Sequence, residues 1–247
     1  MNYLYFLLPI FLLNMIPDNF KTEQKKYARV RQAYADKEMI VKQDLSSVGI
    51  KDMNFELFIR AFKKEKQLEL WCEGKTNEEY SLVKTYKICS SSGKEGPKRK
   101  QGDYQVPEGF YYIDRFNPFS NFYLSLGINY PNSSDKKLSE YSNPGGDIFI
   151  HGACVTIGCI PLTDDKIKEV YLYAIEAKNS GQSKIPVHIF PCKLEGKEYT
   201  NLKNRYKEDQ EMLTFWKSLE AGYKYFKEKK DIPDIKTNNK GYYYLDE

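Results

Sequence analysis

Histidine is scarce in this sequence: its 247 residues contain only His151 and His188, beside five cysteines. The chain also lacks the Cys-x-x-Cys and His-Glu-x-x-His spacings, which excludes the metal sites that those motifs form. We therefore expect no metal and no cofactor. We find no internal repeat of roughly 20 to 50 residues, which excludes a solenoid or propeller built from such units.

Neither sign of charge dominates the chain. The 38 basic and 34 acidic residues leave a net charge of +4, which is too small to indicate a nucleic-acid partner. The apolar residues make up 41% of the chain and include 21 tyrosines and 14 phenylalanines in the aromatic set. This composition is sufficient for one catalytic domain of ordinary size with extensions.

A long hydrophobic run is missing as well. Residues 3–16 are apolar over about fourteen positions, short of the roughly twenty that a helix needs to cross a membrane. The run fits the core of a signal peptide, although no Lys or Arg precedes it and no Ala-x-Ala site follows it. We expect residues 1–20 to be a signal peptide or an N-terminal anchor, with a buried N-terminal element as the alternative. Membrane contact is expected only through such an anchor.

The segment 147–164 contains the most informative spacing, because it places His151 eight residues before Cys159. A cysteine is mostly a thiol at neutral pH, so an imidazole that takes its proton increases the reactive fraction. Gly152 follows the histidine and Gly158 precedes the cysteine. Glycines allow sharp turns and let backbone amides approach a substrate oxyanion. The pattern therefore indicates nucleophilic catalysis by a thiol.

The cysteines leave other interpretations open. Five is an odd number, so at least one cysteine is free or pairs with another chain. Cys154 is a rival nucleophile three residues after the histidine, and it could instead form a disulfide with Cys159 in an exported protein. Cys72 and Cys89 lie in strand-like segments, where burial as small apolar side chains is the expected role.

The same segment resembles a known motif. Ile150-His151-Gly152 followed by Thr156-x-Gly158-Cys159-Ile160 and Asp164 is similar to the active-site motif of the L,D-transpeptidase family, also called the YkuD domain. Further matches narrow the resemblance to the YafK-like branch and extend it over residues 55–192, among them Gly102-Asp103, Asn117-Pro118, Tyr130-Pro131-Asn132 and Ile185-Pro-Val-His188. Ile157 and Pro161 stand where a second histidine and a basic residue are usual. These departures concern substrate recognition and leave the nucleophile and the base in place.

The resemblance implies a role for each residue of the motif. Cys159 would be the nucleophile that attacks a carbonyl of the peptidoglycan stem peptide, and His151 the general base and acid. The backbone carbonyl of Gly152 would orient the imidazole. The backbone amides of Gly158 and Cys159 would stabilise the oxyanion.

Three residues outside the motif have candidate roles. Lys98 belongs to a basic loop that either borders the cleft and attracts a stem-peptide carboxylate or is simply solvated. Tyr130 is a cleft-lining candidate by analogy with the family, with ordinary packing as the alternative. His188 lies in an apolar strand-like run, where a core histidine rather than a second base is expected.

The order of patterns along the chain predicts an α+β fold. Its parts are a helical segment over residues 21–54, a β-rich domain over 55–192 and an amphipathic helical extension over 193–247. Inside the domain we expect a helix over residues 164–178 with Thr163 or Asp164 as its N-cap. The prediction is a β-rich, YkuD-like catalytic domain with mixed, sandwich-like sheets, flanked by N- and C-terminal helices.

The family resemblance and the N-terminal run together predict an exported enzyme of the periplasm or cell envelope. The expected reaction is L,D-transpeptidation through a cysteine acyl-enzyme on peptidoglycan stem peptides. The first alternative is an amidase or L,D-endopeptidase of the same fold, which would release proteins or peptides from peptidoglycan. The second is a catalytically inactive wall-binding protein. The expected partners are stem peptides and, for the hydrolase, a wall-linked protein.

Overall fold

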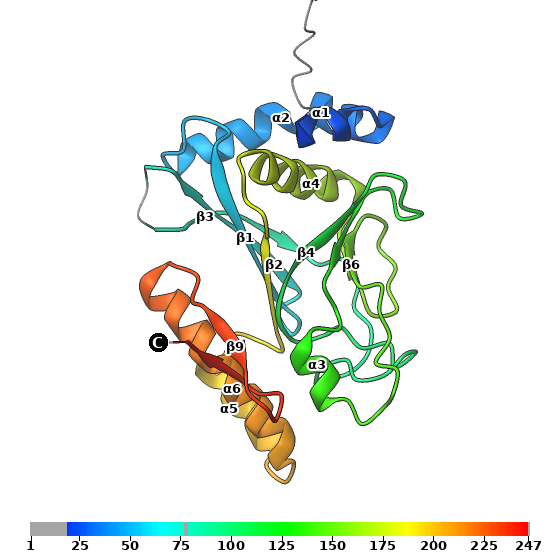
Figure 1. Cartoon of the computed structure of the whole chain (residues 1–247), viewed down its shortest axis with the longest axis vertical. Helices are drawn as coiled ribbons and strands as arrows, with labels where there is room; N and C mark the ends of the chain where they lie inside the picture. Colours follow the sequence, from blue (N-terminus) through cyan, green and yellow to red (C-terminus); the bar gives the residue numbers. More distant parts are fainter. Residues whose placement is uncertain (1–18, 77–78, 247) are drawn as a thin grey trace, which may run out of the picture.

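The computed structural model describes residues 19–76 and 79–246, which form an α+β fold (Figure 1). The expectation of a mixed sheet with helices before and after it in the chain is confirmed. The signal peptide or anchor expected at residues 1–20 lies outside the described residues except for its last two positions. In the part that the structure describes, no helix is long and apolar enough to cross a membrane.

Eight of the described strands form one mixed sheet. Their order across the sheet is β3 (Ser81–Lys87), β2 (Gln67–Gly74), β1 (Phe55–Phe62), β8 (Pro186–Phe190), β4 (Gly109–Asn117), β5 (Ser125–Ile128), β6 (Phe149–His151) and β7 (Ile160–Pro161). The pairs β1–β8 and β6–β7 are parallel, and the other pairs are antiparallel. The candidate motif therefore lies at one edge of the sheet.

Strand β4 joins the two halves of this sheet. Its residues 109–112 pair with β8, whereas its partners from Ile113 onward lie on β5. A register shift between Ile113 and Arg115 separates the two parts, and such a bulge bends a strand and increases its twist. The half that contains β5, β6 and β7 is therefore turned away from the half that contains β1, β2 and β3.

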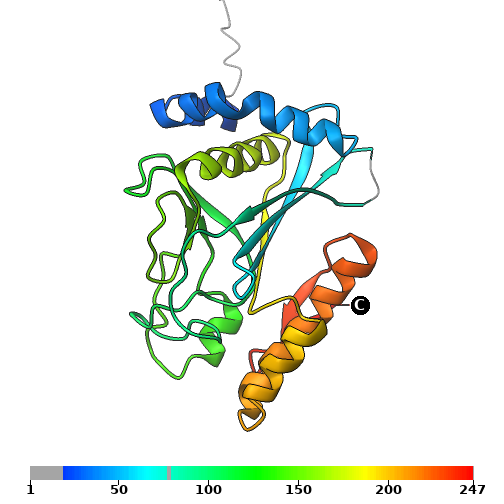
Figure 2. The ribbon, with the colours of Figure 1, turned by 180° about the vertical axis from the view of Figure 1, so that it is seen from behind.

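Helix α4 (Asp164–Asn179) covers one face of the sheet, and Thr163 caps it by accepting a hydrogen bond from the Lys166 amide. This confirms the helix and the N-cap predicted from the sequence. Every residue from 170 to 175 is fully buried, because α4 lies between the sheet and α2 (Ala28–Ser47) (Figures 1 and 2). The N-terminal segment forms two helices, α1 (Phe20–Lys25) and α2, with a break at Tyr27.

The C-terminal segment covers the opposite face of β1 and β8. It consists of α5 (Gly196–Arg205), α6 (Gln210–Lys229) and the two-stranded sheet of β9 (Ile235–Thr237) and β10 (Tyr243–Leu245). Phe62 of β1 and Phe190 of β8 pack with Trp216 and Leu219 of α6 in one buried cluster. The amphipathic stripe predicted for this segment therefore packs on the domain, and the tail pairs with β9 instead of extending the main sheet.

Candidate active site

The parallel pair β6–β7 brings the motif histidine and cysteine together. Ile150 lies beside Ile160 and His151 beside Pro161. Continuing this register back by one residue places Cys159 beside Phe149, on the face of the sheet that carries His151. From ordinary strand spacing and rise, the two Cα atoms are then about 8 Å apart. His151 and Cys159, eight residues apart in the sequence, are thus diagonal neighbours on adjacent segments of the sheet.

His151 is almost fully buried, and its ring is fixed on two sides. Nδ1 lies 2.5 Å from the backbone carbonyl oxygen of Gly152, and the ring packs against Phe122 with centroids 4.6 Å apart. A carbonyl only accepts hydrogen bonds, so Nδ1 carries the proton and Nε2 keeps a free lone pair. Burial lowers the pKa of His151 below its ordinary 6.5, although the bond to Gly152 opposes the shift. The ring is therefore neutral at pH 7, the form that a base needs.

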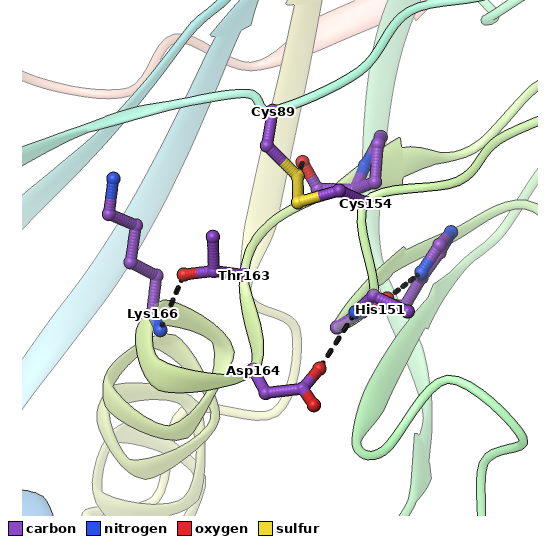
Figure 3. Close-up of a disulfide and its surroundings, with 9 residues drawn as sticks. Cys89, His151, Cys154, Thr163, Asp164 and Lys166 are labelled. Carbon is purple, nitrogen blue, oxygen red and sulfur yellow. Dashed lines mark hydrogen bonds between the residues drawn. A yellow bond between two sulfur atoms is a disulfide. The ribbon is translucent and has the colours of Figure 1, made fainter.

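Gly152 is held so tightly that no other residue fits there. Its amide donates to the Leu124 carbonyl oxygen at 3.1 Å, and an added Cβ would lie 2.6 Å from Oδ1 of Asp164 and 2.7 Å from the carbonyl oxygen of Phe122. The same Asp164 oxygen accepts a hydrogen bond from the Ala153 amide at 2.8 Å (Figure 3). From the sequence, Asp164 was only a motif match and a helix-cap candidate; in the structure it fixes the backbone that follows His151.

The thiol of Cys159 is half-buried beside β6 and does not hydrogen-bond to His151. Among the described residues, the acceptor for this thiol is the carbonyl oxygen of Asp147, which lies 3.6 Å from Sγ. Burial raises the pKa of Cys159, and the Asp147 carboxylate adds to the rise, whereas the Phe149 amide and the Lys98 ammonium oppose it. The thiol is therefore protonated at neutral pH, so attack on a carbonyl requires a base to remove that proton.

The two amides expected to stabilise an oxyanion converge on one atom. The Gly158 and Cys159 amides both donate to Oγ1 of Thr156, at 3.1 and 2.8 Å. The Thr156 hydroxyl in turn donates to the Cys159 carbonyl oxygen at 2.8 Å. The hydroxyl oxygen thus occupies the point toward which both amides are directed, and an oxyanion could take that place only after the Thr156 side chain turns away.

A disulfide joins Cys89 to Cys154, with Cα atoms 5.5 Å apart (Figure 3). This overturns two alternatives raised by the sequence, because a bonded Cys154 is neither a nucleophile nor the partner of Cys159. It also corrects the expectation for Cys89, which follows β3 and is cross-linked instead of packing as an isolated apolar side chain. Cys159 is free, as catalysis requires, and the loop 152–158 is covalently tied to the segment after β3.

Lys98 and Tyr130 do not present their polar groups to a cleft. Lys98 is 5% exposed, and its Nζ lies 2.7 Å from an Asp103 carboxylate oxygen and 2.8 Å from the Lys100 carbonyl oxygen. The Tyr130 hydroxyl lies 3.0 Å from the Pro144 carbonyl oxygen, and the residue is 5% exposed. Both stabilise the loops beside Cys159, and their polar atoms already have partners within the protein. A substrate contact of either residue stays a prediction, and it would require these bonds to be exchanged.

Comparison with known proteins identifies the domain that contains this site. The L,D-transpeptidase catalytic domain, YkuD, matches residues 57–189. YafK of Escherichia coli strain K12, named provisionally as an L,D-transpeptidase, is 34% identical over 197 residues, which cover 77% of this chain and 74% of YafK.

Two solved structures show weaker likeness. The helical cell shape determining protein Pgp2 of Campylobacter jejuni is 20% identical with a TM-score of 0.45, over 81% of this chain and 80% of Pgp2. L,D-transpeptidase 1 of Mycobacterium tuberculosis is 12% identical with a TM-score of 0.30, over 55% of this chain and 62% of that one. The domain match and the similarity to YafK are decisive: this chain belongs to the L,D-transpeptidase (YkuD) family.

Proposed function

We propose that the chain is a cysteine acyltransferase that acts on peptidoglycan stem peptides as an L,D-transpeptidase. The observation that supports this most is the placement of a free thiol at Cys159 beside a neutral imidazole at His151, whose Nδ1 is bound to Gly152. A neutral histidine with one nitrogen tethered offers its other nitrogen as a base. The site therefore has a nucleophile and a base in the required states of protonation.

In the first half-reaction, Nε2 of His151 takes the proton of the Cys159 thiol as Sγ bonds to the carbonyl carbon of the substrate. Negative charge develops on the carbonyl oxygen, and the amides of Gly158 and Cys159 would stabilise it once Thr156 Oγ1 has left their common point. The C–N bond then breaks, and the amine leaves with the proton held by His151. The product is a thioester at Cys159.

In the second half-reaction, an acceptor amine attacks the thioester and loses a proton to His151. The new amide forms, the S–C bond breaks, and the proton returns to the Cys159 sulfur. Water in place of the amine would give hydrolysis by the same sequence of proton transfers. The choice between transpeptidation and hydrolysis therefore depends on which acceptor reaches the thioester. Analysis of the products distinguishes the two reactions.

We further propose that the enzyme works outside the cytoplasm, in the periplasm or cell envelope. The Cys89–Cys154 disulfide supports this, because Cys154 is exposed and such bonds persist in oxidising compartments but are rare in the cytosol. Stem peptides lie in the same compartment. Counting thiols in the denatured, unreduced protein gives three if the disulfide is formed and five if it is not.

The test of the enzyme is covalent labelling of the nucleophile. We expect the purified chain to gain the mass of one carbapenem, and the Cys159→Ala variant to gain none. Cys192→Ser is the matched control, because Cys192 is also a free cysteine but lies buried away from the motif, and it should label like wild type. Incubation with muropeptides then gives cross-linked or shortened products. An unlabelled wild type with unchanged muropeptides would contradict the proposal and favour a wall-binding protein.

A further inference from the structure

A pocket of about 240 Å³ opens directly beside the nucleophile. Cys159 forms part of its wall. The β1–β2 turn and the segment 90–95 contribute further lining residues, among them Ser92, Lys64, Lys66 and Lys94, and strands β1 and β8 contribute Ala61 and Ile189. Ordinary small-molecule sites measure roughly 300–1,000 Å³. This pocket is therefore suited to one end of a longer ligand whose next group reaches the thiol.

The carboxylates in the pocket wall already have partners. Glu108 is fully buried; one of its oxygens lies 2.7 Å from Nζ of Lys63 and the other accepts from Nε1 of Trp216 at 2.8 Å. Lys63 also donates to two backbone carbonyl oxygens, which uses its three hydrogens. Glu95 forms an ion pair with Arg205. None of these groups offers a free charge to a ligand.

Three lysines and Ser92 are among the other polar residues that line the pocket. Across residues 19–76 and 79–246, Lys64, Lys66 and Lys94 form no ion pair with any carboxylate. The side-chain oxygen of Ser92 is buried and has no hydrogen-bond partner. A buried hydroxyl without a partner is costly, and a bound acceptor would satisfy it. The cavity next to Cys159 is therefore lined by three exposed lysines that have no ion pair in the described part of the chain and by one residue with an unpaired hydroxyl.

We propose that this pocket binds a carboxylate of the acyl-donor peptide, and so determines which carbonyl is presented to Cys159. The inference rests on the proposed function and names the part of the substrate that the enzyme recognises. A carboxylate is acceptor-only and takes several hydrogen bonds at once, which matches lysines that only donate and a hydroxyl that can donate. A neutral sugar or an uncharged peptide would leave the three ammonium groups uncompensated.

The test measures binding without turnover, in the Cys159→Ala background. Calorimetry compares a stem tetrapeptide that has free carboxylates with the same peptide amidated at every carboxylate. We expect the amidated peptide to bind at least tenfold more weakly. Lys94→Gln should weaken binding of the free peptide about fivefold, and the triple change of Lys64, Lys66 and Lys94 to Gln about fiftyfold or more, with little effect on the amidated peptide.

Lys217→Gln is the matched control, because Lys217 is an exposed lysine of α6 outside the pocket, and it should leave both affinities unchanged. Equal affinity for the two peptides, no measurable binding of either, or equal losses in Lys217→Gln and Lys94→Gln would overturn the proposal. The carbapenem adduct of wild type, measured in parallel, reports whether the proposed nucleophile is active. If wild type forms the adduct but peptide binding does not depend on carboxylates, the proposed role of the pocket is wrong and the proposed function stands. If wild type forms no adduct, the proposed function itself is wrong.

Discussion

The two histidines of this chain lie in regions that are held together differently. His188 lies in the centre of the sheet, and its ring packs edge-on against Phe58 and Phe110 with centroids 4.5 and 4.7 Å away. Burial lowers the pKa of His188 to about 3, and its Nδ1 has no hydrogen-bond partner among the described residues. His151 lies near the edge of the sheet and is tethered through Nδ1 to Gly152. Aromatic burial thus keeps the His188 ring neutral and without a polar partner at Nδ1 in the structure described, whereas the tether to Gly152 fixes the ring of His151, the proposed base.

The surroundings of the two rings show the same contrast. Around His188 the sheet and the C-terminal helices are joined by aromatic packing, as in the edge-on pair of Phe190 in β8 and Tyr223 in α6. Around His151 the backbone is fixed by single contacts: the Asp164 carboxylate, the Thr156 hydroxyl and the Cys89–Cys154 disulfide. The centre therefore has many small contributions to its stability, and the site has a few that can each be removed by one substitution.

The largest effect is expected from removing the base. His151→Gln retains a hydrogen-bonding side chain but takes no proton from Cys159, so the rate of carbapenem acylation should fall by about 10²–10⁴-fold. His188→Leu should change that rate less than about threefold when equal amounts of folded protein are compared. Both rates come from intact mass against time. A His151→Gln variant that is acylated as fast as wild type would contradict the proposed role of His151 as the base.

The pH profile of wild type sharpens this prediction. Acylation needs the neutral form of His151, and burial lowers the pKa of that ring below 6.5. The rate should therefore rise with pH through a value below 6.5 and be level by pH 7. An acid limb centred well above 6.5 would contradict this direction and show that a negative charge stabilises the protonated ring.

Cutting the disulfide should have the next largest effect. The bond closes a loop of 65 residues, and removing a cross-link of this kind costs about 2–4 kcal/mol in the free energy of unfolding. We expect this loss in the Cys89→Ser, Cys154→Ser double variant, measured by urea denaturation, with acylation slowed severalfold because the loop before Cys159 loses its tether. A reductant should lower the stability of wild type and leave the double variant unchanged. Insensitivity of wild type to the reductant would contradict the cross-link.

Features that depend on neighbouring residues were predictable from the sequence, whereas features that depend on long-range pairing were not. Helix α4 and its cap at Thr163 follow from local capping and apolar patterning. The placement of β8 between β1 and β4 depends on strand pairing across more than sixty residues, which no local pattern encodes. The alternation of its side chains explains why Val187 faces α4 while Phe190 faces the C-terminal helices.

The same distinction between local and long-range features applies to the candidate site. His151 ends β6 and Cys159 immediately precedes the adjacent β7, so their short spacing, together with the family motif around them, indicated the pair. The partner of Cys154 lies 65 residues away and comes near only because the sheet folds, so the sequence offered only the nearby Cys159 as an alternative partner. The Thr156 hydroxyl bonds to amides two and three residues ahead; this is a local turn, and a Thr before Gly-Cys was the signal that could have indicated it.

A smaller effect is expected from the pH dependence of stability at the centre. As pH falls through 6.5, the unfolded chain protonates His188 while the folded chain, with a pKa of about 3, does not. The unfolded state then binds more protons, so stability falls as pH falls. Between pH 8 and 5.5, wild type should lose about 1.4 kcal/mol more than His188→Leu. Urea unfolding at both pH values measures this difference.

The comparison with His188→Leu is needed because another buried group titrates in the opposite direction. Burial raises the pKa of Asp135 to about 6, so the folded state takes up a proton there before the unfolded state does and gains stability as pH falls. Asp135 is present in both proteins, so its contribution cancels in the difference. Equal pH dependence of the two proteins would mean that His188 is protonated in the folded state.

The smallest effect is expected at Ile157, where the family usually has a second histidine. The side chain of Ile157 is 75% exposed, and exposed substitutions usually change stability by less than about 0.5 kcal/mol. Ile157→His should also change the acylation rate less than about threefold, because the acceptor of the Cys159 thiol is the carbonyl oxygen of Asp147, which precedes β6, and not a group of the loop 152–158. Intact mass against time measures this rate. A tenfold rise or fall in the acylation rate would show that the side chain at position 157 contacts the substrate. The region that governs catalysis would then include the exposed loop as well as His151 and Cys159.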